Sequence, residues 1–156
     1  MTTPAVGDLA PDFSLRDQHG QQVRLSSYRG RSAVALVFYP FAFSGTCTGE
    51  LCEIRDNLGV FAAQDVTVLA CSVDHMFTQR AYADAQGLTF AVLSDFWPHG
   101  AVASSYGVFD ERAGAARRGT FLIDVDQVVR WNVVNGIGQA RDFQGYLSAL
   151  SSLRAT

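Results

Sequence analysis

Short apolar runs alternate along the chain with segments whose apolar residues have helical spacing. Residues 33–39 are a continuous apolar run, which is typical of a strand buried on both faces. Pro40 ends this strand, because proline cannot donate to a sheet ladder. The next apolar residues lie three, four and three positions apart, at Leu51, Ile54, Leu58 and Phe61. This spacing predicts a helix that runs to about residue 63 and holds Cys47 in its first turn.

The rest of the pattern predicts an edge hairpin, further α/β units and a closing strand pair. Strands are expected around residues 12–15 and 23–25, followed by a short helical turn capped by Ser26 or Ser27. Further strands are expected at residues 66–73, 90–93, 119–125 and 128–134, and helices at 75–86, 101–106 and 141–153. This alternation predicts one α/β domain over residues 1–156, with a sheet covered on both sides.

Composition and charge narrow the classes of function. The 156 residues are 48% hydrophobic and 17% charged, with a net charge of −3, which is typical of a globular domain and not of a nucleic-acid-binding protein. The apolar run that contains Pro40 is too short to cross a bilayer, and residues 1–4 lack the pattern of a signal peptide. Three cysteines, an odd number, do not suit a secreted disulfide framework. We therefore expect a cytoplasmic protein without a membrane partner.

The position of Cys47 carries the first chemical prediction. Unpaired amide N–H groups and the positive end of the helix dipole stabilise an anion in the first turn of a helix. A thiol at this place loses its proton more readily, and the thiolate is the nucleophile. Ligand sites of α/β sheets also lie beyond the carboxyl ends of the strands. Cys47 is therefore either a reactive cysteine or an inert buried one, as cysteines commonly are.

The residues around Cys47 resemble a known signature. Pro40, Ser44 and Cys47 form the pattern Pro-x-x-x-Ser-x-x-Cys, which resembles the active-site motif of the peroxiredoxins, thiol peroxidases with a thioredoxin-like fold. The likeness extends to residues 11–13, 38–40 and 118–124, and residues 93–100 and 106–109 are similar to the AhpE branch of that family. The resemblance implies a central mixed β-sheet flanked by helices, with an N-terminal β-hairpin.

The resemblance also implies a role for each matching residue. Cys47 would be the peroxidatic cysteine, whose thiolate attacks one peroxide oxygen and becomes a sulfenic acid. Ser44, Arg118 and the backbone N–H of Cys47 would donate hydrogen bonds to the peroxide, and the charge of Arg118 would favour the thiolate. Pro40 would shield the sulfur from water. Glu50 shares a helix face with Cys47 and would hold the arginine in place.

Two features depart from the family pattern or leave it ambiguous. Ser44 stands where the family usually has threonine, which keeps the hydroxyl but loses the methyl group that restricts its rotamer. Arg117 directly precedes Arg118, and only the spacing to Gly119 and Thr120 assigns the catalytic role to Arg118.

Cys52 follows Cys47 by five residues, the spacing of the resolving cysteine in the PrxQ (bacterioferritin comigratory) peroxiredoxins. On an intact α-helix, Cα atoms five residues apart are separated by about 8.6 Å, whereas disulfides rarely exceed about 7 Å. A Cys47–Cys52 disulfide therefore needs the first helical turns to unwind, which Gly49 favours by about 1 kcal/mol relative to alanine. Either Cys52 resolves the sulfenic acid in this way, or it is idle and an external thiol does so. Cys71 lies in a strand pattern and is expected to be a core residue.

The expected reaction uses no metal, haem or flavin. His19, His75 and His99 pair with no cysteine at ligand spacing, so no metal site is predicted. The expected substrates are hydrogen peroxide, alkyl hydroperoxides or peroxynitrite, and the reductant is a thioredoxin, a glutaredoxin- or mycoredoxin-like protein or a low-molecular-weight thiol. Aromatic residues near Trp97 would suit a homodimer. The alternative is a non-enzymatic redox sensor or holdase, which would not need a donor such as Arg118.

Overall fold

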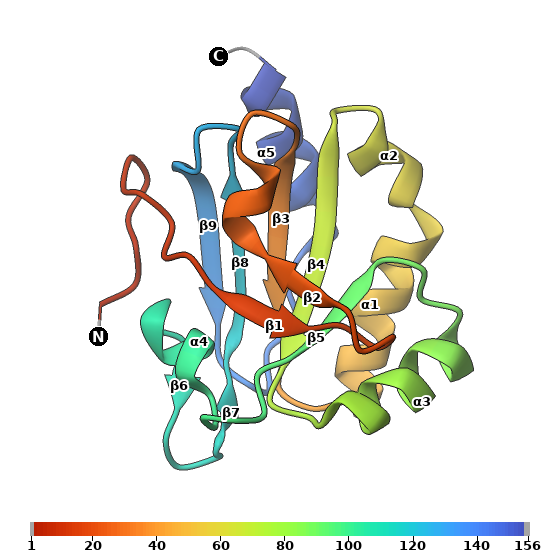
Figure 1. The fold of residues 1–156 in the computed structure, drawn as a ribbon. Helices are drawn as coiled ribbons and strands as arrows, with labels where there is room; N and C mark the ends of the chain where they lie inside the picture. The colour runs from red at the N-terminus through yellow and green to blue at the C-terminus, as the bar shows by residue number, and fades with distance from the viewer. Residues whose placement is uncertain (1, 155–156) are drawn as a thin grey trace.

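A mixed β-sheet forms the centre of the computed structural model, which describes residues 2–154 (Figure 1). From one edge to the other its strands are β2 (Gln22–Arg24), β1 (Ser14–Arg16), β5 (Ala91–Ser94), β4 (Val66–Ser72), β3 (Ala33–Phe38), β8 (Arg118–Ile123) and β9 (Val129–Asn135). β3 pairs in parallel with β4 and antiparallel with β8, and β1 and β2 form an antiparallel hairpin. The predictions of a mixed sheet and of an N-terminal hairpin are confirmed.

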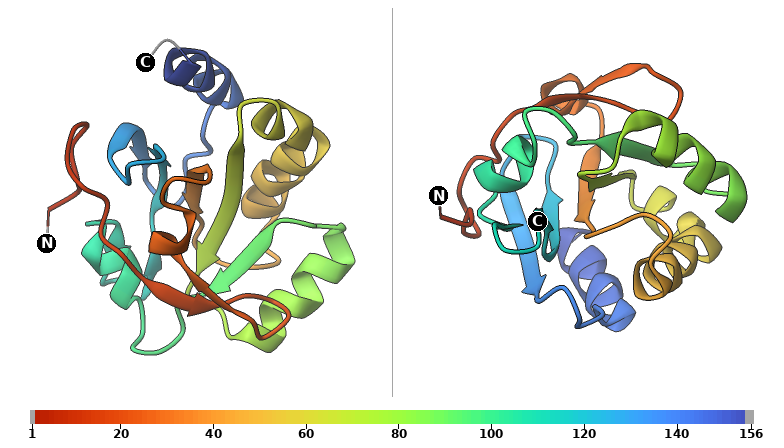
Figure 2. Two further views of the ribbon diagram at one scale, coloured as in Figure 1. Left: turned by 45° about the horizontal axis from the view of Figure 1, so that its top comes forward. Right: turned by 90° about the horizontal axis from the view of Figure 1, so that it is seen from below.

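Helices pack on both faces of this sheet. One face carries α1 (Gly45–Asp56), α2 (Leu58–Ala62), α3 (Met76–Gln86) and α5 (Phe143–Arg154), and the other carries the 3-10 helix η1 (Leu25–Tyr28) and α4 (Ala101–Ser105). Seen from below in Figure 2, α1 and α5 lie together on one side of the sheet, and α4 lies with the N-terminal segment on the other. No helix within residues 2–154 is long and apolar enough to span a membrane.

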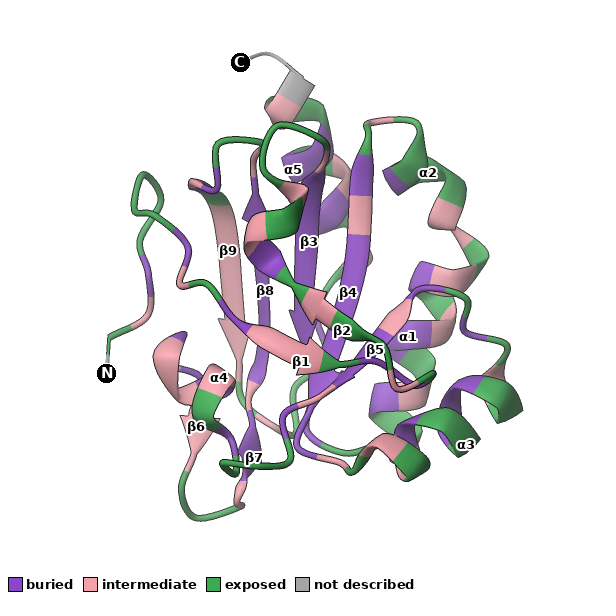
Figure 3. Cartoon of the chain, in the orientation of Figure 1, coloured by how far each residue is buried: buried purple, intermediate pink, exposed green. Residues whose placement is uncertain are grey.

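The strand β3 is enclosed by the sheet and the helices on both faces, and all six of its residues are buried, as are those of its neighbour β8 (Figure 3). Its side chains alternate between two apolar clusters, because successive residues of a strand point to opposite faces. Ala35 and Val37 belong to the cluster beneath α1 and α5, whereas Leu36 and Phe38 belong to the cluster on the opposite face. Both packed faces fix β3, so the strand is a rigid base for the segment that follows it.

Three elements differ from the sequence prediction. The helix expected to run to residue 63 is divided, because Asn57 leaves the helical region at φ −119° and ψ 22° between α1 and α2. The 3-10 helix η1 begins at Leu25 after Arg24, so neither Ser26 nor Ser27 caps it. A two-stranded sheet of β6 (Phe109–Asp110) and β7 (Ala115–Ala116) was not predicted, since strands of two residues have no detectable period.

Three central strands have the ends that matter for the site on the same side of the molecule, at one end of the sheet. The carboxyl ends of the parallel strands β3 and β4 lie there together. Because β8 runs in the opposite direction, its first residue, Arg118, lies at this same end of the sheet. The register pairs Val37 with Thr120. The segment between β3 and α1, which contains Pro40 and Ser44, starts at this end of the sheet. The topology therefore gathers the residues that the sequence singled out.

Candidate active site

Cys47 is the third residue of α1, and its side chain is fully buried. Ser44 is the N-cap in an extended conformation, and its carbonyl accepts the first helical hydrogen bond from the Thr48 N–H at 2.8 Å. Within the described chain, the Ser44 hydroxyl makes no capping hydrogen bond to the helix. The thiol therefore lies among the unpaired N–H groups of a first helical turn, with a hydroxyl at the N-cap that the helix does not use.

The loop of residues 40–44 connects β3 to this helix. Pro40 is buried and follows the buried Tyr39 at the end of the strand. Phe41 and Phe43 are both exposed by about half of their surface, at 40% and 56%. The burial of Pro40 is compatible with the predicted shielding of the sulfur, whereas the loop around it is open to solvent.

Arg118 begins β8 and is almost completely buried. Its Nη1 donates to Oε1 of Glu50 at 2.5 Å, and its Nε donates to the carbonyl of Ile137 at 2.7 Å. Arg117 points elsewhere, since its Nη2 donates to the carbonyl of Gly107 at 2.6 Å. The geometry separates the two neighbouring arginines, and only Arg118 contacts the helix that carries Cys47.

A second arginine, Arg141, holds the same carboxylate. Its backbone N and its Nε donate to Oε2 of Glu50 at 2.6 and 3.0 Å, and its Nη2 donates to Oε1 at 3.0 Å. Its Nη1 donates to the carbonyls of Phe38 and Gly119 at 2.7 and 3.0 Å. The sequence pattern placed Arg141 at the start of the last helix, where a charge is ordinarily solvated. The helix α5 begins later, at Phe143, and Arg141 is buried in front of it.

Glu50, Arg118 and Arg141 form a buried cluster with a net positive charge. Burial raises the pKa of the Glu50 carboxyl, but the hydrogen bonds and charge of Arg141 and the charge of Arg118 outweigh it, so the pKa is lowered overall. Glu50 is therefore ionised between two guanidinium groups. It lies three residues after Cys47 on the same helix face, so its contact with Arg118 brings a buried cation to that face.

The other two cysteines have different surroundings, and all three are free thiols. Cys52 is half-buried on α1, and its Sγ donates to Oε1 of Gln86 at 3.6 Å. The helix is continuous from Cys47 to Cys52, so a disulfide between them would require it to unwind, as the spacing predicts. Cys71 is fully buried in β4, and its burial raises the pKa of its thiol well above the usual value. Cys71 is a core residue, as expected.

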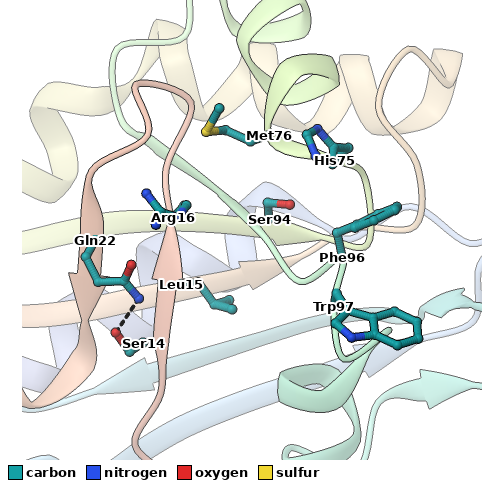
Figure 4. Close-up of a pocket in the computed structure, with 9 residues that line it drawn as sticks. All are labelled: Ser14, Leu15, Arg16, Gln22, His75, Met76, Ser94, Phe96 and Trp97. Carbon is teal, nitrogen blue, oxygen red and sulfur yellow. Dashed lines mark hydrogen bonds between the residues drawn. The ribbon is translucent and has the colours of Figure 1, made fainter.

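A solvent-facing hollow of about 260 Å³ lies beside the N-terminal hairpin and the start of α3 (Figure 4). Its lining includes Arg16, His75, Phe96 and Trp97, but Cys47 is not part of it. Trp97 is 80% exposed, so it is a surface residue at the rim of this hollow and not a core residue. His75 and Phe96 are in ring contact, with centroids 5.0 Å apart.

Comparisons with known proteins identify the family and the fold of the chain. Residues 6–132 match the AhpC/TSA family. Alkyl hydroperoxide reductase E of Mycobacterium tuberculosis is 49% identical over 150 residues, covering 96% of this chain and 98% of the relative. The crystal structure of peroxidoxin BcpB from Mycobacterium tuberculosis has a TM-score of 0.85 at 33% identity and covers 97% of both chains. A reduced 2-Cys peroxiredoxin of Plasmodium vivax has a TM-score of 0.87 at 26% identity, covering 96% of this chain and 82% of the other.

These similarities extend over nearly the whole chain and confirm the thioredoxin-like fold that the motifs implied. The chain belongs to the AhpC/TSA family: it is a peroxiredoxin, a thiol-dependent peroxidase.

Proposed function

We propose that Cys47 is the cysteine that reacts with peroxide. Its thiolate attacks one oxygen of the O–O bond, that bond breaks, and the other oxygen leaves as water or alcohol after it takes up a proton. Cys47 is then a sulfenic acid. The observation that carries this proposal is the buried Glu50–Arg118 pair on the Cys47 face of α1, since it supplies a fixed cation beside a first helical turn.

The neighbouring groups would act on the oxygen that leaves. Negative charge develops on this oxygen, and preorganised donors stabilise it. The Ser44 hydroxyl, the Arg118 guanidinium and the backbone N–H of Cys47 would be these donors. Glu50 would position Arg118 without touching the peroxide, and the buried Pro40 would limit the access of water to the sulfur.

We further propose that Cys52 resolves the sulfenic acid. Its thiol would attack the sulfur of Cys47, form the disulfide and release water, once the first turns of α1 have unwound. Gly49 lies between the two cysteines on the exposed side of the helix, and glycine lowers helix propensity by about 1 kcal/mol relative to alanine. The Sγ of Cys52 donates to Gln86 over a long distance of 3.6 Å, and this weak hydrogen bond would restrain the thiol little.

The peroxiredoxin family implies a peroxide substrate and a thiol reductant. We propose hydrogen peroxide, alkyl hydroperoxides or peroxynitrite as the peroxide, and the similarity to an alkyl hydroperoxide reductase supports the second of these. The proposed electron donor is a thioredoxin, a glutaredoxin- or mycoredoxin-like protein or a small thiol. The proposed assembly is a homodimer in the cytoplasm, which the exposed Phe96 and Trp97 would support as contact residues.

Steady-state consumption of hydrogen peroxide with a thioredoxin system tests the proposal. We expect Cys47→Ser to abolish turnover and Cys71→Ser to leave it unchanged. Cys52→Ser should lose turnover with thioredoxin and retain the first oxidation of Cys47. Turnover of Cys52→Ser at the wild-type rate would make the protein a one-cysteine peroxidase that an external thiol reduces. Full activity of Cys47→Ser would refute the assignment of Cys47.

A further inference from the structure

The connection between β9 and α5 reaches the buried guanidinium of Arg118 through one carbonyl group. The carbonyl of Ile137 accepts a hydrogen bond from Nε of Arg118 at 2.7 Å, and Nη1 of Arg118 donates to Oε1 of Glu50 at 2.5 Å. Of the five N–H donors of the guanidinium, the described chain uses these two. Two bonds from different nitrogens restrict the rotation of a planar group, so Ile137 and Glu50 together set where the other N–H groups point.

The first part of this connection, residues 136–140, is held by hydrogen bonds and not by packing. Gly136 and Gly138 are exposed, and a Cβ added at either one would meet no described atom within 4 Å. Glycine also has more backbone freedom than any other residue. Within the segment, the backbone N–H of Gln139 donates to the carbonyl of Gly136 at 3.1 Å. The place of the Ile137 carbonyl therefore depends on the few hydrogen bonds that shape this segment.

The side chain of Asn135 joins the two ends of the segment. Its Nδ2 donates to the carbonyl of Ala140 at 3.1 Å. Asn135 is the last residue of β9, and the register of β8 and β9 pairs it with Arg118. The amide thus fixes the segment that carries the Ile137 carbonyl at the place along the sheet where Arg118 begins its strand.

We propose that Asn135 is a positioning residue for the reaction with peroxide. Its amide gives residues 136–140 their shape, and this shape holds the Ile137 carbonyl on Nε of Arg118. The other N–H groups of Arg118 then keep the orientation in which they stabilise the oxygen that leaves. The proposal rests on the proposed role of Arg118 and adds a residue that lies outside the Pro-x-x-x-Ser-x-x-Cys motif.

The rate constant of the reduced protein with hydrogen peroxide, followed as loss of the Cys47 thiol, tests the proposal. A hydrogen bond between neutral groups changes an equilibrium by about 2- to 12-fold, so Asn135→Ala should lower the rate constant about fivefold. Asn135→Asp keeps the size of the side chain, but its carboxylate accepts only and would face the carbonyl of Ala140, so it should lower the rate at least as much. Rates within about twofold of the wild type in both variants would refute the proposal.

Asn132→Ala is the matched control. Asn132 lies earlier on β9, and its Nδ2 donates to the carbonyl of Pro4 at 3.0 Å. This variant loses the same kind of bond from the same strand and leaves residues 136–140 untouched. The alanine variants of Asn132 and Asn135 should have similar melting temperatures, and Asn132→Ala should react with peroxide at the wild-type rate. Equal slowing in the two would indicate a general loosening of β9 and overturn the proposal.

A double-mutant cycle separates action through Arg118 from a general loss of structure. In an Arg118→Ala background the guanidinium is absent, so the addition of Asn135→Ala should change the already slow reaction by less than about twofold. In an Arg117→Ala background, which loses only a bond to the Gly107 carbonyl, the same addition should still slow the reaction about fivefold. A fivefold loss in both backgrounds would contradict the positioning role.

Failure of the proposed function gives a different result. Arg118→Ala would then react with peroxide at the wild-type rate, or the Cys47 thiol of the wild type would not be lost at all, and the role of Asn135 would fail with it. A slow Arg118→Ala together with a wild-type rate in Asn135→Ala would overturn the role of Asn135 alone.

Discussion

Replacement of Glu50 by glutamine would remove the carboxylate that lies between two buried guanidinium groups. In the wild type, Oε2 accepts from the backbone N and Nε of Arg141, and Oε1 accepts from Nη1 of Arg118 and Nη2 of Arg141. In Glu50→Gln an amide NH₂ group replaces one of these oxygens, so donors face donors on that side. Both arginines also lose their opposite charge, although they remain buried.

The size of the effect follows from this geometry. Removal of one partner of a buried ion pair costs about 3–5 kcal/mol, because the remaining charge is left uncompensated. For a chain of this length each kcal/mol lowers the melting temperature by about 2–4 °C, so we expect a decrease on the order of 10 °C. The reaction with peroxide should also slow. Deletion of an oxyanion donor costs about 100- to 1000-fold, and Arg118 would be displaced but not deleted, so we expect about 10- to 100-fold.

Thermal unfolding and competition kinetics for hydrogen peroxide against a haem peroxidase measure the two effects. Glu53→Gln is the control, since Glu53 is exposed on the same helix and surface substitutions usually change stability by less than about 0.5 kcal/mol. If Glu50→Gln has the same melting temperature as Glu53→Gln and reacts with peroxide at the wild-type rate, the buried cluster neither stabilises the protein nor positions Arg118.

The same carboxylate predicts a dependence of stability on pH. The pKa of Glu50 is lowered in the folded protein, so its ionised form is favoured there relative to the unfolded chain, in which glutamate titrates near about 4.3. The contribution of Glu50 is therefore complete above that value and is lost as the pH falls through the lower folded pKa. In urea unfolding between pH 7 and pH 3, the stability difference between the wild type and Glu50→Gln should narrow on acidification. A difference that widens would contradict the sign of the shift.

Three further predictions concern single groups. Ser44→Ala should slow the reaction with hydrogen peroxide about 100-fold in the same competition assay, because it deletes one hydrogen-bond donor; an unchanged rate would remove Ser44 from the site. Arg118→Ala should slow this reaction about 100-fold or more, whereas Arg117→Ala, which loses only its bond to a backbone carbonyl, should stay within about twofold. Cys71 should resist iodoacetamide in the folded protein and react only after unfolding, because burial disfavours its thiolate; mass spectrometry of rapidly labelled native protein checks this.

Most of the architecture could be predicted from the sequence because the elements near the site have strong local signals. The apolar run before Pro40 is β3, and Gly87 ends α3 in the left-handed conformation that glycine adopts most readily. The break at Asn57 could not be predicted, since the apolar spacing continues through it from α1 into α2. At the break, Nδ2 of Asn57 donates to the carbonyl of Glu53 at 2.8 Å, a contact that the apolar spacing does not reveal.

The sequence could predict the residues of the candidate site that lie close together along the chain. It could not predict a residue that only burial in the fold brings to the site. Ser44, Cys47 and Glu50 follow one another at intervals of three residues at the start of α1, so their proximity follows from the sequence alone. Arg141 gave no such signal, because an isolated charged residue next to a helix is usually solvated. Arg141 lies 91 residues from Glu50 along the chain, and only the fold brings the two together.

The most direct measurement of the central claim is peptide mass mapping of the reduced protein after one equivalent of hydrogen peroxide, without reductant. We expect oxidation at Cys47, with a Cys47–Cys52 disulfide as the main product and Cys71 still a free thiol. A sulfenic or sulfinic Cys47 beside a free Cys52 would retain the peroxidatic role of Cys47 and contradict the two-cysteine cycle. An unmodified Cys47 would contradict the whole account of the site.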